Sequence, residues 1–203
     1  MERPLALVAE DRLTQAVLHK CVAEFLPGYT VIRSDVTGGR GNVQRALAAY
    51  ANLARTMPVI VGVDLDHDDC APALLTTWNL ANFEQKRLLV RVAVREIESW
   101  ILADRKRYAT FVGGTSDHIP SAPDEIGDPK RFLLEFARET ASDELKRDLI
   151  PTNFSQYPRI GKAYNLRMCK FVHDKWRPHV ARARSASLDR AIRAMEAITL
   201  ATV

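Results

Sequence analysis

Residues 58–66 read PVIVGVDLD, an apolar run that passes directly into two acids, Asp64 and Asp66. The apolar residues follow one another without the three-to-four spacing of an amphipathic helix, which is typical of a strand covered on both faces. Strands of this kind occur in parallel sheets, where the connecting helices cover both sides. We therefore predict a central strand of a parallel sheet here, with two acids at its carboxyl end.

Three further apolar runs of strand length lie around this one, and helical patterns separate them. The predicted strands are residues 5–9, 29–33, 58–63 and 88–94, and the predicted helices between them are about 13–25, 43–54 and 74–86. Asn42 stands where a residue capping the second helix belongs. Regular strand–helix alternation predicts an α/β fold, a Rossmann-like parallel sheet flanked by helices.

The alternation stops at the loop of residues 113–127, which is rich in Pro, Gly, Ser and Asp. We predict an α/β core over residues 1–112 and a helical C-terminal extension, residues 113–203, packed on that core. Helices are expected near residues 129–140, 161–176 and 185–201, the last one capped by Ser185 or Ser187.

The composition of the chain limits its class. Of 203 residues 47% are apolar, enough for a sizeable core, and no apolar run is long enough to span a membrane. Three widely separated cysteines exclude a cysteine-based zinc site and favour a reducing compartment. We expect a cytoplasmic protein without a membrane partner.

Charge is unevenly distributed along the chain. Residues 1–156 carry 19 Lys and Arg against 22 Asp and Glu, whereas residues 157–203 carry 10 against 3. A basic tail of this kind could bind a polyanion or an acidic protein. The same composition is also typical of a well-solvated surface helix. The candidate nucleic-acid-binding residues are Arg40, Lys162, Arg167, Lys170, Arg182 and Arg184.

Acidic residues follow three of the four predicted strands: Glu10, the pair Asp64 and Asp66, and the pair Glu96 and Glu98. The carboxyl ends of parallel strands share one edge of the sheet, where functional groups collect. Carboxylates gathered there repel one another unless a cation neutralises them, and oxygen ligands without cysteine favour Mg²⁺ or Mn²⁺. We expect Asp64 and Asp66 to face one ion from an extended segment. Glu98 is preferred to Glu96 as a further ligand.

These positions resemble the Toprim fold of topoisomerases, primases and overcoming-lysogenization-defect nucleases. In that fold a Glu ends the first strand and an Asp-x-Asp ends the third, matching Glu10, Asp64 and Asp66. Residues 96–104, EIESWILAD, and the SASL of residues 185–188 look like small stand-alone Toprim-like proteins, many of them encoded beside ATPases in anti-phage islands. Where the family has Gly after the Glu, this chain has Asp11.

The resemblance implies a Mg²⁺- or Mn²⁺-dependent nuclease, the effector of a multi-protein anti-phage system. Asp64, Asp66 and Glu98 would then hold metal, and Glu10 would be a general base or outer-sphere ligand. The expected partners are nucleic acid, DNA ahead of RNA, and an ATPase or other protein. Self-association stays open.

Three other functions compete with a nuclease. One is a non-catalytic Toprim-like binding or regulatory subunit of the same kind of complex. A second is a receiver-like phosphoacceptor domain, although the Lys that ends the fifth strand of receivers is not evident here. The third, a haloacid-dehalogenase-type phosphatase, would want its Asp-x-Asp on the first strand.

Overall fold

The computed structural model describes residues 2–82, 87–153 and 159–200. Its sheet has four parallel strands in the order β2-β1-β3-β4. They are β1 (Arg3–Ala9), β2 (Tyr29–Val36), β3 (Val59–Asp64) and β4 (Leu88–Ala93). This confirms the predicted α/β class and is consistent with a Rossmann-like fold. No helix of the described ranges is long and apolar enough to cross a membrane.

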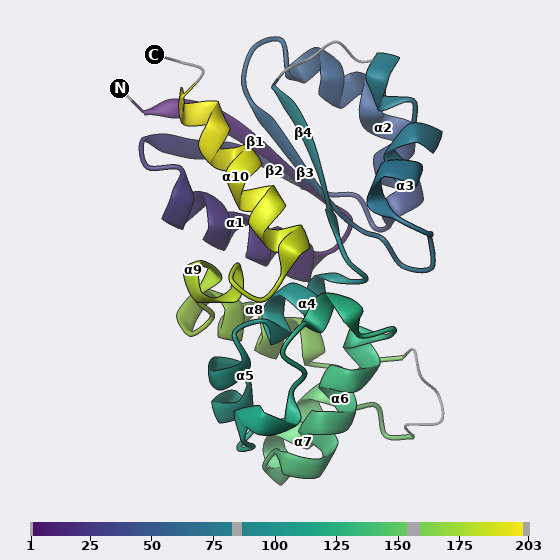
Figure 1. Cartoon of the computed structure of the whole chain (residues 1–203), viewed down its shortest axis with the longest axis vertical. Coiled ribbons are helices and arrows are strands. Elements are labelled where there is room, and N and C mark those ends of the chain that lie inside the picture. The colour runs from purple at the N-terminus through teal and green to yellow at the C-terminus, as the bar shows by residue number, and fades with distance from the viewer. Residues whose placement is uncertain (1, 83–86, 154–158, 201–203) are drawn as a thin grey trace.

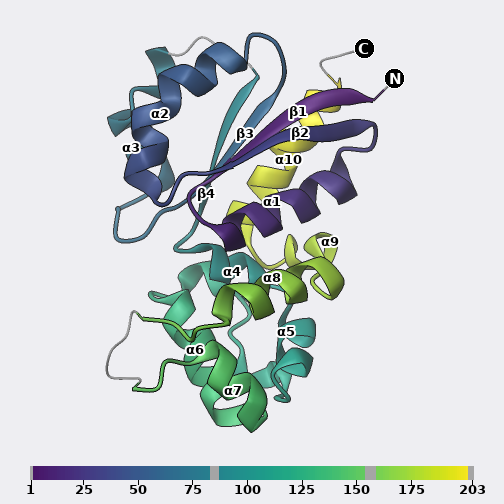
Figure 2. The ribbon, with the colours of Figure 1, turned by 180° about the vertical axis from the view of Figure 1, so that it is seen from behind.

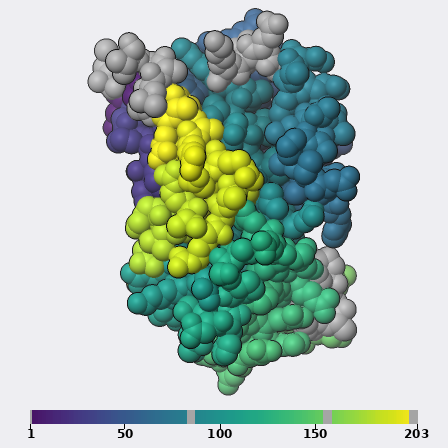
Figure 3. Space-filling view, in the orientation of Figure 1, coloured from purple at the N-terminus to yellow at the C-terminus, as the bar shows by residue number. Residues whose placement is uncertain are grey.

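Helices cover both faces of the sheet (Figures 1 and 2). Helices α1 (Arg12–Phe25) and α10 (Ala186–Leu200) lie on one face, and Figure 3 shows α10 running down the front of the molecule. Helices α2 (Arg40–Leu53) and α3 (Ala71–Thr77) lie on the other, followed by the 3₁₀ turn η1 (Leu80–Asn82).

The apolar core is divided by the sheet, because successive side chains of a strand point to opposite faces. Leu5 and Leu7 of β1 pack in the cluster that contains α1 and α10. Ala6 and Val8 pack in a second cluster with α2 and α3. Every position from 5 to 9 is therefore buried, which explains the unbroken apolar run in the sequence.

The other helices form a second half below the sheet (Figures 1 and 2). Their bounds are α4 (Ile97–Leu102), α5 (Arg105–Phe111), η2 (Ser116–His118), η3 (Pro123–Glu125), α6 (Pro129–Thr140), α7 (Asp143–Leu149), α8 (Tyr164–Asp174) and α9 (Pro178–Ala181). Buried residues of this half, including Trp100 and Trp176, belong to the same apolar cluster as β1 and α1. The chain then returns to the sheet in α10, so the halves share one core. The predicted division at residue 112 stays a prediction.

The strands and several helix ends agree closely with the sequence predictions. All four strands occur, helix α6 has the predicted bounds, and Ser185 caps α10 by accepting from the amide of Leu188 at 3.1 Å. The prediction that Asn42 caps the second helix is wrong. Helix α2 begins at Arg40, with Gly39 as the preceding residue at φ 129°, and the Asn42 amide donates to the carbonyl of Thr37. A backbone conformation open to glycine, rather than a side-chain cap, begins this helix.

Two further helix predictions differ from the structure. Helix α3 ends at Thr77, well short of the predicted residue 86, and residues 83–86 lie outside the described ranges. Helix α7 has no counterpart in the sequence analysis. At Asp143–Leu149 it is too short to display a helical period, although Ser142 caps it through the amide of Leu145.

Gly161 sets the distance between α7 and the start of α8. A Cβ at this position would lie 2.3 Å from the carbonyl oxygen of Asp148 and 2.5 Å from the carbonyl carbon of Leu149. Backbone atoms cannot give way as a side-chain end can, so we expect Gly161→Ala to lower the free energy of unfolding by about 3 kcal/mol. Gly127→Ala is the matched control, since a Cβ there meets nothing within 4 Å. Urea unfolding of both variants checks this, and equal losses would contradict it.

Candidate functional site

Two acids meet at the carboxyl ends of the neighbouring strands β1 and β3. Glu10 follows the last residue of β1 and Asp64 is the last residue of β3, and their side chains are only 9% and 3% exposed. Their carboxyl groups lie close enough for the charge of Glu10 to raise the pKa of Asp64. Two ionised carboxylates this close repel each other, which favours a proton or a cation between them.

Glu98 joins these acids from the first turn of α4, the helix that follows β4. Its side chain is 1% exposed, and its Oε1 accepts from the Tyr164 hydroxyl at 2.8 Å. The same oxygen lies 3.4 Å from the Nζ of Lys130. Glu96 points to the rim of the group, where its carboxylate accepts from the Lys130 amide at 2.8 Å. Of the two glutamates, Glu98 is the one buried beside Asp64.

Two oxygens in this group are buried without a hydrogen-bond partner in the described residues. They are Oδ1 of Asp64 and Oε2 of Glu98. A buried carboxylate oxygen that nothing satisfies carries a large desolvation cost, so such atoms indicate a missing proton, water or cation. Tyr164 and Lys130 hold the other oxygen of Glu98, which leaves the unpartnered one free for a ligand.

The electrostatics of the group favour its protonated form. Burial, and then the charges of Glu10 and Glu98, raise the pKa of Asp64 well above its ordinary value. Burial also raises the pKa of Glu10, and it raises that of Glu98 to about 7 although Lys130 opposes the change. Burial alone would lower the pKa of Lys130, but the carboxylates of Glu98 and Glu96 raise it overall, so this lysine stays charged.

The helical half of the molecule therefore completes the acidic group. Lys130 comes from the start of α6 and Tyr164 from the start of α8. The sequence analysis missed both, because neither stands in a motif. A Lys that follows the first Pro of a helix is usually a surface residue. A Tyr in an apolar stripe is usually a core residue. Only the contacts between distant segments reveal them.

Asp66 is more exposed than the buried acids, although its charge raises the pKa of Glu10. The extended segment expected to align it with Asp64 ends at Asp64, and Asp66 has a left-handed backbone with φ 51°. Its side chain is 43% exposed and lies 3.6 Å from Arg40. Its amide donates to the carbonyl of Arg95 at 2.9 Å, which fixes the turn. A turn replaces the two-residue alternation of a strand here, so the two aspartates do not share a direction.

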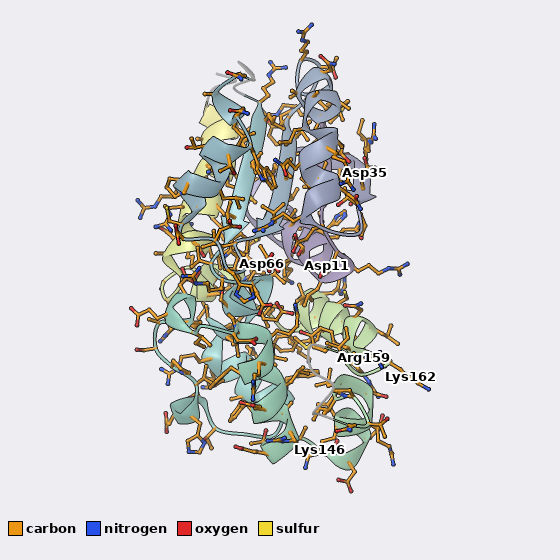
Figure 4. The ribbon with its side chains drawn as sticks, turned by 90° about the vertical axis from the view of Figure 1, so that its right-hand side faces the viewer. Asp11, Asp35, Asp66, Lys146, Arg159 and Lys162 are labelled. Carbon is orange, nitrogen blue, oxygen red and sulfur yellow. The ribbon has the colours of Figure 1, made fainter. Side chains whose placement is uncertain are left out.

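A cleft of about 470 Å³ lies beside the buried group. Glu10 belongs to both, since it contacts Asp64 and also lines the cleft with Asp11 and Asp66. Figure 4 shows Asp11 and Asp66 where the sheet half meets the helical half. The glycine loop before α2 forms another wall, and its Gly38 and Gly39 amides donate to the Glu10 carbonyl at 2.9 Å. Of the three buried acids, Glu10 is therefore the one that a ligand in this cleft would contact.

Asp11 and Arg40 have structural contacts at the cleft. Asp11 caps α1 by accepting from the Thr14 amide at 2.8 Å. A glycine at this position would lose that cap. The Arg40 guanidinium donates to the carbonyls of Asp64 and Leu65, at 3.3 and 2.9 Å, and pairs with Asp68. Arg40 thus holds the loop after β3 in place, and its guanidinium is already paired with a carboxylate, that of Asp68.

Most of the predicted basic residues are engaged in ion pairs. Arg167 pairs with Asp148 and Glu144, both at 2.6 Å, and Lys170 pairs with Asp174 at 2.7 Å. Arg182 pairs with Asp189 and with Glu196.

The other two predicted residues, Lys162 and Arg184, are exposed, and among the described residues neither has a carboxylate partner. Figure 4 shows Lys162 on the helical half, on the same side of the molecule as Asp11. The positive charge available to a polyanion is therefore smaller than the sequence predicts.

The chemistry of these residues suits a divalent cation, but their side chains are not arranged as a complete set of ligands. In the described ranges, no three or more His, Cys, Asp or Glu side chains are grouped closely enough to hold a metal ion as they stand. The unpartnered oxygens of Asp64 and Glu98, with Glu10 beside them, are nevertheless the hard ligands that Mg²⁺ and Mn²⁺ take.

Metal affinity at this site should depend on pH around 7. The raised pKa values of Glu98 and Asp64 mean that both acids hold protons at lower pH, and a metal must displace them. Below pH about 7 the affinity for Mn²⁺ should fall by roughly tenfold per pH unit for each proton displaced. Calorimetric titration of Mn²⁺ between pH 5.5 and 8.5 measures this, and an affinity constant across that range would contradict it.

No protein-family model, curated protein or solved structure matches this chain in the three comparisons.

Proposed function

We propose that the chain is a Mg²⁺-dependent nuclease of Toprim type that cleaves phosphodiester bonds. The observation that carries the proposal is the pair of unpartnered, buried oxygens on Asp64 and Glu98, beside Glu10 at the carboxyl edge of a parallel sheet. Three buried acids in one place cost stability unless they serve a ligand, and hard oxygen donors suit a divalent cation.

Each residue has a distinct part in the proposed chemistry. Asp64 and Glu98 would hold the cation, which when bound polarises a phosphate and lowers the pKa of water. Glu10 faces both the cleft and Asp64, so it is placed to accept a proton from an attacking water or to bind at the outer sphere. Tyr164 and Lys130 orient Glu98 through its Oε1. Asp66 lies at the cleft wall and would contact the ion or the substrate from the exposed side.

The proposed substrate is nucleic acid, with DNA ahead of RNA, entering through the cleft beside Glu10. Arg12 lines this cleft, and Lys162 precedes Asn165, which also lines it. These cations would neutralise phosphates on either side of the scissile bond. We propose that Arg167, Lys170 and Arg182, which form ion pairs with carboxylates of the chain, stabilise the fold and do not bind nucleic acid. An ATPase or other protein of an anti-phage system remains the proposed partner.

Cleavage of plasmid and single-stranded DNA and RNA by the purified chain tests this function. Activity should need Mg²⁺ or Mn²⁺ and should disappear in excess EDTA. The assay is run alone and with the products of neighbouring genes, because a partner can be required. Absence of metal-dependent cleavage under both conditions would overturn the nuclease proposal.

A non-catalytic subunit that uses the same cleft for binding is the second candidate. The observation that favours it is that the acids of the described residues do not form a complete set of metal ligands, with Asp66 exposed beside Arg40. Such a subunit would bind nucleotide or nucleic acid in the presence of Mg²⁺ without turnover. Binding without cleavage in the same assay would support it.

A receiver-like phosphoacceptor is less well supported by the geometry. The described sheet has four strands, and the lysine beside the acids is Lys130 of helix α6. Asp64, the residue that would accept the phosphoryl group, is 3% exposed and lies behind Glu10. A small-molecule phosphodonor that fails to label Asp64 would remove this possibility.

A further inference from the structure

A second cavity lies at the opposite edge of the sheet, where the strands begin. It has a volume of about 500 Å³, which is within the range of small-molecule sites. It lies between the starts of β1, β2 and β4 and the C-terminal part of α10. None of the acids of the candidate metal site lines it.

The cavity follows from the residues that α10 places over the sheet. Leu89 of β4 lies on the face that α10 covers, because side chains alternate along a strand and Ala93, four residues on, packs in the cluster that contains α10. Ala194 and Ala197 line the cavity from α10, where larger side chains such as Met195 fill the core. Small side chains at this level leave a space bounded mainly by apolar atoms.

Two arginines line this apolar space, and no carboxylate of the described residues pairs with either of them. Arg3 and Arg87 line the cavity, and Arg91 lies two residues beyond Leu89 on the same face of β4. The Nε of Arg91 is buried without a hydrogen-bond partner among the described residues, and burial lowers the pKa of this arginine. Within the described ranges, none of these three arginines forms an ion pair with a carboxylate. An unpaired guanidinium beside apolar atoms favours an anionic ligand.

The walls distinguish an aliphatic ligand from an aromatic one. The aliphatic side chains that line the cavity include Met57, Leu89 and Ile198. Tyr29 is the one aromatic residue among the described lining residues, and the Arg3 guanidinium already stacks on its ring at 4.3 Å from the centroid. Arg3 thus already covers one face of this ring, whereas a flexible alkyl chain can fill the space without stacking.

We propose that this cavity binds a medium-chain aliphatic carboxylate. The alkyl chain would lie against the apolar walls, and the carboxylate would lie at the edge formed by Arg3 and Arg87. This would give the chain a small-molecule site at the strand edge opposite to the acids. The proposal is independent of the nuclease, because it depends on none of the acidic residues.

Calorimetric titration with decanoate, below its critical micelle concentration, tests the proposal in the full chain. We expect saturable one-to-one binding, at least about tenfold weaker binding of decanol, and no binding of decyltrimethylammonium. The absence of saturable decanoate binding up to about 1 mM would overturn the proposal, as would equal affinity for decanol.

Variants locate the site. Ala197 is exposed, so Ala197→Phe should fill the cavity without disturbing the fold and should abolish binding. Replacing Arg3 and Arg87 by Gln should weaken decanoate about tenfold and leave decanol unchanged. Lys175→Gln, an exposed cation of the helical half, is the matched control and should bind as the wild type does. Unchanged decanoate affinity in a folded Ala197→Phe variant would place binding elsewhere and overturn the proposal.

Discussion

Replacing Asp64 by Asn is expected to lower the rate of metal-dependent cleavage by about a thousandfold or more. Asp64 is central to the acidic group, since the charges of both Glu10 and Glu98 raise its pKa. The amide keeps the shape of the side chain and removes the negative charge that a cation needs. Single-turnover cleavage with saturating Mg²⁺ measures the effect.

Asp66→Asn is the matched control for this prediction. Asp66 has the same chemistry two residues away, but it is 43% exposed and lies beside Arg40. An exposed charge contributes little, so we expect a loss of about tenfold or less. Equal and large losses in both variants would show that both aspartates bind the ion, as the sequence pattern alone suggests. A large loss for Asp66→Asn only would contradict the assignment of Asp64.

Replacing Lys130 by Met is expected to lower the free energy of unfolding by about 3–5 kcal/mol at pH 8 without metal. Lys130 is the cation nearest to the buried Glu98, and its removal leaves ionised acids without compensation. The raised pKa of Glu98, about 7, sets the pH range of the effect. Below pH about 5.5 Glu98 is protonated in the folded state, so the same variant should lose much less stability. Chemical unfolding at pH 5.5 and 8 compares the two conditions.

Added Mg²⁺ gives this variant a second readout. A divalent cation in the acidic group would replace the charge that Lys130 supplied, so Mg²⁺ should stabilise Lys130→Met more than the wild type. Lys130→Arg keeps the charge and should restore most of the stability. If the loss is the same at both pH values and Mg²⁺ does not reduce it, Lys130 only contributes packing and does not neutralise the acids.

Much of the fold could be predicted from the sequence because the sheet is buried on both faces. Val59–Val63 is apolar at every position, since one face packs against α1 and the other against α2. The strand ends could also be located, because the acids Glu10 and Asp64 interrupt the apolar runs where each strand ends. Parallel strands bring such ends together, so proximity of the acids follows from topology.

The rest of the site depends on backbone conformation and on distant contacts. The backbone turns at Asp66, which has a left-handed conformation, so Asp66 does not continue the strand that contains Asp64. The apolar pattern of a strand does not predict such a turn. Lys130 and Tyr164 reach Glu98 across 32 and 66 positions of sequence, from helices whose starts look ordinary. Acids such as Asp148 and Asp189 pair with arginines of the basic tail, so less of its charge is available to a polyanion than its composition suggests.

The most direct test is the position of Mn²⁺ in crystals soaked at pH 8, located by anomalous scattering. We predict a peak within bonding distance of Oδ1 of Asp64 and Oε2 of Glu98, the two buried oxygens without a partner, with Glu10 beside it. A peak at Asp66 and Asp68 alone, or none in a crystal soaked at millimolar Mn²⁺, would contradict the account of this group as a divalent-cation site.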